Sequence, residues 1–379
     1  MKLPNNTFCV LPWVSLEASP IGTVRPCCLA DDEIRDSNGE KFELNRSTFL
    51  EIQTSTDMQK LRQQFLDGKK PQTCRKCWNE ERGGRTSKRM HTLDRLKHML
   101  PEQSWTADAK PLMFLDLKLG NICNLKCRIC GSWSSSQFAA EEVNYSPPAE
   151  RKNTFAYQML QAGAWPRENP QFWSEIDRAL ADIRYIEFTG GEPFMIREHF
   201  DMLQGIVDRG IAGQVEIHYN TNGTQWPEGA ENIWRHFKTV EIAFSIDDIG
   251  ARFEYQRSNA VWSEVCENLN RFRDLKQQYS NIVLQVCTTV NIFNVRYLDD
   301  VARWIDRNQE SFNFVYWNMM HDAWYFSVGC LPDTAKTVIA DHLRSAEIPP
   351  QFRSEFDRII DFMNRGASTD GFIARMKIA

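Results

Sequence analysis

The stretch LMFLDLKLGNICNLKCRIC, residues 112–130, joins an apolar run to three closely spaced cysteines. Its first part, Leu112–Leu119, is rich in residues that favour a β-strand. The loop after it places Cys123, Cys127 and Cys130 at C-x3-C-x2-C spacing. So short a loop can wrap one metal centre, and three thiolates suit three irons of a [4Fe–4S] cluster, which leaves the fourth iron open to a ligand. Two alternatives stay open here: a zinc site with a fourth ligand from elsewhere, and cysteines that bind no metal.

Apolar β-forming runs alternate with amphipathic helical stretches from this point onward. The predicted strands are Leu112–Leu119, Tyr185–Phe188, Val215–Tyr219, Val240–Ser245, Ile282–Val290 and Phe312–Trp317. The predicted helices between them include Glu198–Arg209, Glu231–Phe237, Trp262–Gln278 and Leu298–Asn308. This alternation predicts an α/β fold in which a parallel sheet, covered by helices, curves into a partial (β/α)6 TIM-like barrel. In such folds the chemistry gathers at the carboxyl ends of the strands.

Composition limits the class of protein. The chain has 379 residues, a formal net charge of −5 and 42% hydrophobic residues, which excludes a disordered tail, a collagen-like fibre and a small disulfide knot. No apolar stretch is long enough to span a bilayer and the start lacks the layout of a secretory signal, so we expect a cytoplasmic protein with no membrane partner. In a reducing cytosol its 11 cysteines are expected to serve metal ligation or catalysis rather than disulfides.

A second motif follows one βα unit after the cysteine loop. The stretch YIEFTGGEP, residues 185–193, is a predicted strand that ends in a glycine turn. Together with the cysteine loop it resembles the radical S-adenosylmethionine (radical SAM) superfamily, in which the open iron chelates SAM and the reduced cluster cleaves it to a 5′-deoxyadenosyl radical. The resemblance implies that Gly190 and Gly191 let the backbone approach SAM closely and that Glu192 accepts from its amino group.

Further matches follow the superfamily's order along residues 110–320. The resemblance implies that Asn220 and Asn222 lie at a ribose-contacting strand end, although an ordinary Asn-Gly turn is the alternative. It likewise implies that Ser245 and Arg257 meet the SAM carboxylate, for which a guanidinium is well suited. A surface salt bridge is the alternative for Arg257. Asn291, at the next strand end, is expected to approach the adenosine.

Five thiols lie ahead of this region. They are Cys9, Cys27, Cys28, Cys74 and Cys77, and the C-x2-C pair at the end is a strong metal signal. A zinc ribbon is one interpretation. The arrangement also resembles the auxiliary [4Fe–4S] module called twitch, or part of a SPASM domain, which implies a second cluster for electron transfer or substrate positioning. Five thiols compete for four places, and the position after Gly-x-x-x-Pro favours Cys27 over Cys28.

These patterns predict three domains: a twitch/SPASM-like module at 1–108, a radical SAM core at 109–325 and a C-terminal helical extension at 326–379. The first is a small cysteine-rich α+β module with a hairpin across Ser19–Gly22 and a helix that starts at Ser55. Because the cysteine module takes up all of residues 1–108, we expect no separate leader-peptide-binding domain. Residues 144–169 are expected to form a long irregular insertion.

The resulting hypothesis is a radical SAM enzyme that abstracts a substrate hydrogen, with a peptide or protein side chain as the leading substrate for oxidative modification. The alternatives are a dehydrogenase or epimerase of a small molecule such as a sugar, and a non-catalytic metal-binding or electron-transfer module. An external donor such as flavodoxin or ferredoxin is expected to reduce the cluster. No catalytic acid, base or hydrogen donor is selected from the conceivable residues, which are Cys266, Cys287, Cys330, Tyr325, His321 and Asp248. Nucleic acid is not expected as a partner, since the one basic run comprises only Arg82, Arg85, Lys88 and Arg89.

Overall fold

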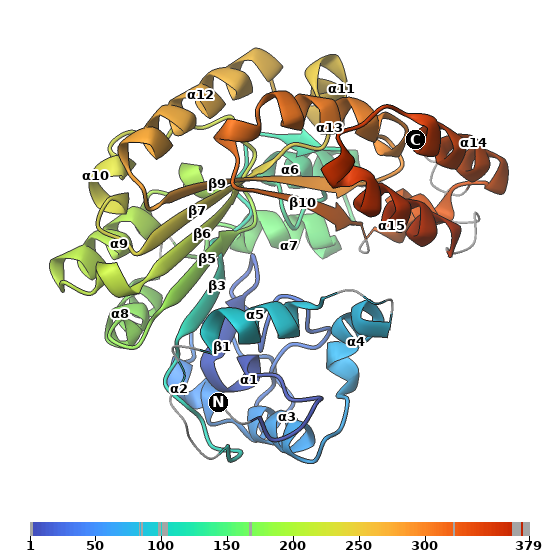
Figure 1. Ribbon diagram of the computed structural model, residues 1–379. Coiled ribbons are helices and arrows are strands. Elements are labelled where there is room, and N and C mark those ends of the chain that lie inside the picture. The colour runs from blue at the N-terminus through green and yellow to red at the C-terminus, as the bar shows by residue number, and fades with distance from the viewer. Residues whose placement is uncertain are drawn as a thin grey trace. The chain divides into compact units, whose positions relative to one another are not determined.

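The computed structural model describes residues 3–82, 84, 86–97, 100, 105–166, 169–320, 323–365 and 373. The chain forms two compact units, which we call unit 1 and unit 2 and describe separately. Figure 1 labels their helices and strands. Unit 1 comprises residues 1–122, 132–219 and 232–239. Unit 2 comprises residues 123–131, 220–231 and 240–379.

The sheet of unit 1 is parallel except at one edge. Its strands are β1 (Ser15–Ala18), β2 (Val24–Arg25), β3 (Phe114–Lys118), β5 (Tyr185–Thr189) and β6 (Glu216–Thr221), the last two residues of β6 belonging to unit 2. Their order is β6-β5-β3-β1-β2, and only β2 runs antiparallel to its neighbour. The predicted hairpin is confirmed as β1 and β2. The sequence gives no hint, however, that β1 extends the same sheet as β3.

The two faces of this sheet differ in chemistry. Side chains alternate between the faces of a strand, and paired residues point to the same side. The apolar face carries Leu115, Leu117, Ile186, Phe188 and Ile217, all at most 1% exposed. The opposite face, which we call the polar face, carries Glu17, Asp116, Lys118, Glu187, Thr189 and His218. Charged residues at this density are unusual in parallel strands, which are normally apolar on both sides.

Nine helices begin and end within the described part of unit 1. They are α1 (Leu11–Val14), α2 (Phe49–Gln53), α3 (Thr56–Leu66), α4 (Arg75–Arg82), α5 (Lys88–Leu96), α6 (Ser136–Tyr145), α7 (Phe155–Ala162), α8 (Pro170–Ala179) and α9 (Glu198–Asp208). The predicted start at Ser55 is confirmed, because its side chain accepts from the backbone N–H of Met58 at 3.3 Å. Helix α5 lies over part of the polar face, where Lys88 contacts the ring of Phe114 and Arg95 that of Tyr185.

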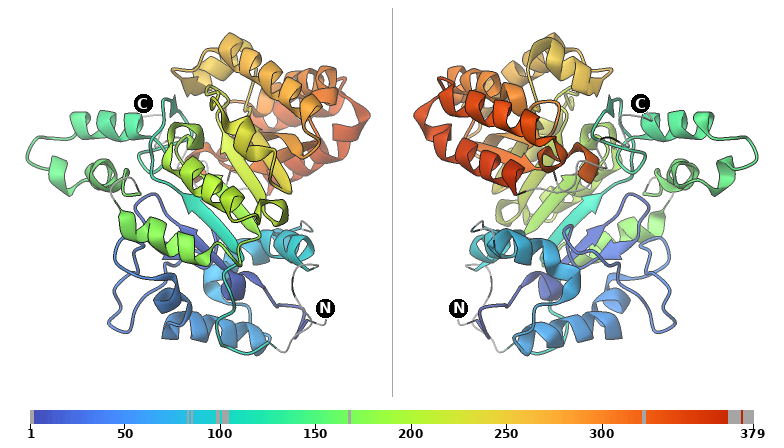
Figure 2. Two further views of the ribbon diagram at one scale, coloured as in Figure 1. Left: turned by 90° about the vertical axis from the view of Figure 1, so that its left-hand side faces the viewer. Right: turned by 90° about the vertical axis from the view of Figure 1, so that its right-hand side faces the viewer.

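The expected irregular insertion at 144–169 is wrong. It contains the end of α6, a short 3-10 helix at Arg151–Asn153 and all of α7. Thr154 caps α7 by accepting from the N–H of Tyr157 at 3.1 Å, so the prolines of this stretch separate two helices rather than prevent them. Helices α6 and α7 pack against each other (Figure 2).

Unit 2 repeats the α/β pattern. Its main strands are β7 (Thr239–Ser245), β9 (Ile282–Val290) and β10 (Phe314–Met319), and a small antiparallel ladder joins β4 (Lys126–Cys127) to β8 (Arg257–Ser258). Strand β9 pairs in parallel with both β7 and β10. The helices are α11 (Gly250–Gln256), α12 (Trp262–Gln278), α13 (Leu298–Arg307), α14 (Asp333–Ser345) and α15 (Arg353–Asn364), while α10 (Ala230–Trp234) belongs to both units. Helices α14 and α15 form the C-terminal pair (Figure 2).

The fold class is therefore confirmed as α/β with a mostly parallel sheet. All six predicted strands are present, as β3, β5, β6, β7, β9 and β10, with ends that shift by at most two residues. The four predicted helices are present as α9, α10, α12 and α13. Among the described residues, no helix combines the length and the apolar character needed to cross a membrane.

A buried histidine in unit 1 predicts acid sensitivity. His199 on α9 is fully buried and contacts the hydroxyl of Tyr219 at 3.1 Å, and burial lowers its pKa from 6.5 to about 3. Below pH 6.5, His199 therefore binds a proton in the unfolded chain but stays neutral in the folded chain. The free energy of unfolding consequently falls as pH falls from 6.5 towards 3. We expect this group to cost about 1.4 kcal/mol of unfolding free energy per pH unit in that window.

Chemical denaturation of wild type and His199→Gln between about pH 7 and 5 checks the direction of this pH dependence. The stability difference between the two proteins should shrink as pH falls. The matching change at exposed His236 should leave the slope unaltered. A wild-type slope equal to that of His199→Gln would refute the assignment.

Candidate functional site

The three-cysteine loop in unit 2 is held by backbone pairing to the segment around Arg257. Cys127 on β4 is paired with Arg257 on β8, and the N–H of Arg128 donates to the carbonyl of Gln256 at 2.8 Å. Nitrogen donors face two of the sulfurs. Asn222 Nδ2 lies 3.8 Å from Cys123 Sγ, and Arg257 Nη1 lies 3.8 Å from Cys127 Sγ. Such N–H contacts are typical of sulfur ligands in iron–sulfur sites.

Electrostatics in this loop favour the thiolate of Cys127. A hydrogen bond from Cys130, together with the positive charge of Arg257, lowers the pKa of Cys127. The same bond and burial raise the pKa of Cys130. The three thiols with a guanidinium beside them are a donor set that fits a [4Fe–4S] cluster bound by three cysteines.

Arg257 is only 8% exposed and is anchored by Asp247, whose carboxylate lies 2.6 Å from Nη2. Its Nε has no hydrogen-bond partner in the described part of the chain. The surface-salt-bridge alternative is therefore wrong: Arg257 is a buried cation that keeps one N–H available in unit 2. A carboxylate such as that of SAM suits this position.

The glycine turn lies in unit 1 and packs on backbone. Gly190 and Gly191 have φ of 76° and 58°, a region that favours glycine. A Cβ on Gly191 would lie 2.5 Å from the carbonyl oxygen of Ile122, which accepts from the N–H of Glu192 at 2.7 Å. Only glycine fits this close approach. The turn is thus the kind of cradle that the predicted SAM contact requires.

The other predicted SAM contacts have mixed surroundings. Glu192 is fully buried, and its carboxylate accepts from the N–H of Phe194 at 3.3 Å. Asn222 contacts Asn124 at 3.0 Å, next to the cysteine loop. The side chain of Asn291 bonds within unit 2, to Gln256 and to the backbone of residues 289 and 293. Asn220 and Ser245 are half-buried at the ends of their strands. The contacts of all five with SAM stay predictions.

Four N-terminal cysteines line one pocket in unit 1. They are Cys9, Cys27, Cys74 and Cys77, and the remaining lining is formed by Leu11, Leu29, Ala30, Phe65 and Arg89. Burial raises the pKa of all four thiols, that of Cys27 to about 11, and the neighbouring thiols raise the pKa of Cys9, Cys27 and Cys74 further, so a bound cation is needed to hold the four as thiolates. Among the described residues, no three His, Cys, Asp or Glu side chains are arranged to bind one single metal ion. The four thiols nevertheless surround one pocket.

Cys28 lies elsewhere in unit 1. It does not line this pocket, and its pKa is raised by burial and by the charges of Asp116 and Glu187, against which Lys88 acts. Its electrostatic neighbours are therefore those of the polar face. This geometry supports the preference for Cys27 as the fourth ligand.

Iron analysis separates the two cysteines. We expect Cys77→Ala to lower the iron content of anaerobically reconstituted protein from about eight towards about four per chain, because the three thiolates that remain leave one iron of the auxiliary cubane without a protein ligand and hold it less firmly. Cys28→Ala should keep about eight irons, since Cys28 lies outside the pocket. Loss of four irons in Cys28→Ala, with full loading of Cys27→Ala, would reverse the assignment.

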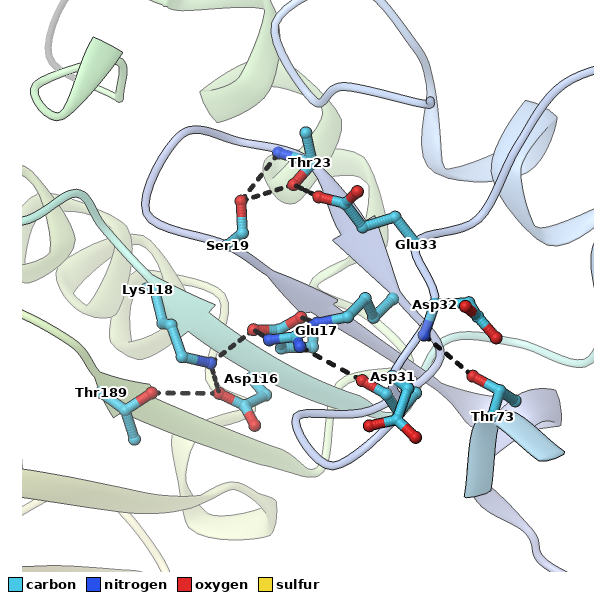
Figure 3. Close-up of polar contacts among 12 residues, drawn as sticks. Glu17, Ser19, Thr23, Asp31, Asp32, Glu33, Thr73, Asp116, Lys118 and Thr189 are labelled. Carbon is cyan, nitrogen blue, oxygen red and sulfur yellow. Dashed lines mark hydrogen bonds and ion pairs between the residues drawn. The ribbon is translucent and has the colours of Figure 1, made fainter. Parts of the chain in front are cut away.

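The polar face is the part of unit 1 that sequence reasoning missed. Glu17 accepts from Arg25 at 2.8 and 2.9 Å and from Lys118 at 2.5 Å, and Lys88 donates to Glu187 at 2.7 Å (Figure 3 shows Glu17 and Lys118). A signal was present, because charged or polar residues recur at every second position of two buried strands, in Asp116-Leu117-Lys118 and Glu187-Phe188-Thr189.

The basic run considered for nucleic acid does not form a patch among the described residues. Lys88 pairs with Glu187 and Arg89 with Glu81, both inside unit 1. Arg82 contacts Asn79, and Arg85 lies outside the described residues. His321, one of the conceivable catalytic groups, also lies outside them.

Comparison with known proteins identifies two matching family models. The model described as Radical SAM superfamily matches residues 117–305, and the SPASM model, described as an iron–sulfur cluster-binding domain, matches residues 9–78. No curated protein matches the sequence.

Solved structures match more distantly. Native anSMEcpe with bound AdoMet and Cp18Cys peptide is 17% identical over 62% of this chain and 59% of that chain, with a TM-score of 0.40. Streptococcus suis SuiB bound to precursor peptide SuiA is 12% identical over 83% of this chain and 67% of that chain, with a TM-score of 0.36. This chain thus spans about three fifths of the length of anSMEcpe.

Proposed function

Because the chain belongs to the radical SAM superfamily, with an iron–sulfur SPASM domain ahead of the radical SAM domain, we propose that it oxidatively modifies a peptide or protein side chain. Its cofactors are a [4Fe–4S] cluster that binds SAM, SAM itself and a second, auxiliary [4Fe–4S] cluster. When bound, the first cluster and SAM supply the radical that abstracts a substrate hydrogen. We propose that the auxiliary module spans 1–108, the radical SAM core 109–325 and a helical extension 326–379.

The chain's own residues bind and orient these groups. Cys123, Cys127 and Cys130 hold the first cluster, and Arg257 offers its spare Nε to the carboxylate of SAM. Gly190 and Gly191 open the backbone, with Glu192, Asn220, Asn222, Ser245 and Asn291 as further contacts to SAM. Cys9, Cys27, Cys74 and Cys77 hold the auxiliary cluster.

The single observation that carries the proposal is the presence of two separate thiol sets. One has three cysteines beside a buried arginine, and the other has four cysteines around one pocket. A set of three leaves an open iron for SAM, whereas a set of four leaves none, which suits electron transfer or substrate positioning. An external donor such as flavodoxin or ferredoxin would supply the electron.

A turnover assay tests the enzyme proposal. Protein reconstituted without oxygen should hold about eight irons and, with dithionite and SAM, release 5′-deoxyadenosine. Loaded protein that fails to cleave SAM would instead indicate the alternative, a non-catalytic electron-transfer module.

The substrate needs a second assay. Short peptides encoded beside the gene, labelled with deuterium on their side chains, should transfer deuterium to 5′-deoxyadenosine and lose two hydrogens in mass. If only a neighbouring sugar substrate transfers its label, the small-molecule alternative replaces the peptide.

A further inference from the structure

The polar face of unit 1 gathers three cations and three carboxylates that the proposed cofactor chemistry does not use. The cations are Arg25, Lys88 and Lys118, and the carboxylates are Glu17, Asp116 and Glu187. Figure 3 shows the central part of this set, in which Lys118 reaches both Glu17 and Asp116. The formal charges cancel, so the face as a whole attracts neither an anion nor a cation strongly.

Each of these three cations already forms an ion pair with a carboxylate. Arg25 donates twice to Glu17, at 2.8 and 2.9 Å, and Lys118 donates to the same carboxylate. Lys88 donates to Glu187 at 2.7 Å. A substrate carboxylate or phosphate would have to break one of these buried pairs, which costs more than the new contact returns.

Asp116 is the exception among the carboxylates. Its Oδ1 accepts from Thr189 Oγ1 at 3.2 Å and lies 3.7 Å from Lys118 Nζ (Figure 3). Its Oδ2 has no hydrogen-bond partner in the described chain, although the residue is only 1% exposed. Ser15 Oγ, on the same face of the neighbouring strand, is fully buried and also unpartnered there. Buried polar atoms are nearly always bonded, so two orphans on one face indicate a missing partner.

The position of these atoms connects them to the glycine turn. Thr189 directly precedes Gly190, and a Cβ on Gly190 would lie 3.1 Å from Cβ of Lys118. The side chains of Lys118 and Glu187 are 19% and 13% exposed, so solvent reaches the edge of the cluster. Solvent therefore reaches this face within unit 1 beside Lys118 and Glu187, next to the turn proposed to contact SAM.

We propose that Asp116 and Ser15 form a binding site for an amide group of the substrate. The carboxylate oxygen Oδ2 accepts from the amide N–H, and the Ser15 hydroxyl donates to the amide carbonyl, which satisfies both orphaned atoms at once. A neutral amide keeps the balance of charge on the face, which a carboxylate or an ammonium group would disturb. The inference rests on the proposed function only in assuming that the substrate binds at the polar face. It narrows the recognised part of the substrate to a peptide group or an Asn or Gln side chain.

Small probes test the site without a known substrate. Crystals of the reconstituted protein are soaked separately in acetamide and in acetate at the same concentration, and ligand-observed NMR measures the affinity of each in solution. We expect acetamide, and not acetate, within hydrogen-bond distance of Asp116 Oδ2. Asp116→Asn should weaken acetamide binding about tenfold or more, since it removes a hydrogen bond to a charged acceptor.

A control isolates the effect of this one carboxylate. Asp299→Asn on α13 removes another buried carboxylate, which pairs with Arg303 and His342, and should leave acetamide affinity unchanged. Binding of acetate on the polar face, no acetamide there in wild type, or equal affinity in Asp116→Asn would each overturn the proposal. Should Asp116→Asn fail to fold, the proposal still stands or falls on whether the wild type prefers acetamide to acetate. Release of 5′-deoxyadenosine is measured independently, so failure of the enzyme proposal is distinguishable from failure of this site.

Discussion

Replacing Cys127 with alanine is expected to abolish the release of 5′-deoxyadenosine and to halve the iron content. Cys127 is buried, is paired with Arg257 across the β4–β8 ladder and carries the thiol whose pKa is lowered in this loop. Loss of one of only three ligands leaves two thiols, which do not hold a cubane. Iron should fall from about eight to about four per chain, since the four-cysteine pocket keeps its own cluster.

Iron and 5′-deoxyadenosine measured on one reconstituted sample check this expectation. The control is Cys266→Ala on α12, which removes a thiol that lies outside both sets and should keep full iron and full cleavage. Cleavage by Cys127→Ala at a tenth of the wild-type rate or more would show that the cluster has other ligands.

Replacing Arg62 with methionine is expected to give the largest loss of unfolding free energy among the variants considered. Arg62 lies on α3, is fully buried and donates to the backbone carbonyls of Pro12, Gln53 and Ala107 at 2.9, 2.8 and 3.3 Å. Burial lowers its pKa to about 10, so the guanidinium stays charged at neutral pH. Methionine fills similar space and relieves the cost of the buried charge, but it leaves three carbonyls without this donor. We expect a net loss of about 3 kcal/mol of unfolding free energy.

Chemical denaturation of the reconstituted protein measures this loss. Arg46→Met, which removes an arginine whose side chain is 60% exposed and paired with Glu43, should cost less than about 1 kcal/mol. Because Arg62 joins α3 to the backbone near Cys9, auxiliary iron should fall in the same variant. Equal stability of Arg62→Met and Arg46→Met would contradict the structural role assigned to Arg62.

The fold could be predicted largely because its strands carry strong local patterns. Ile282–Val290 is strand β9 with the predicted ends, and Trp262–Gln278 is helix α12. Both have apolar residues at the period of their element, which is the most dependable signal in a sequence. The short strand β1 has no such pattern, and its pairing with β3 depends on a partner far away in the chain.

The site could be predicted only where a motif fixes it locally. The cysteine spacing and the glycine turn belong to short stretches, so their residues are recognisable without a fold. The sequence favours Cys27 over Cys28, and the structure supports this choice, because of these two residues only Cys27 lines the pocket. The pairing of Glu17 with Lys118 could not be predicted, since it joins residues about a hundred positions apart.

The pairing of β1 with β3 also governs the order of events in biosynthesis. Ser15 pairs with Phe114, so the first of the amino-terminal cysteines, Cys9, leaves the ribosome about a hundred residues before the strand that completes this sheet. Contacts this distant in sequence form late, because the intervening chain must first be ordered. All the residues that line the amino-terminal pocket, from Cys9 to Arg89, are translated before β3 completes the sheet. The cell must keep these thiols reduced and unoccupied by other metals throughout that interval.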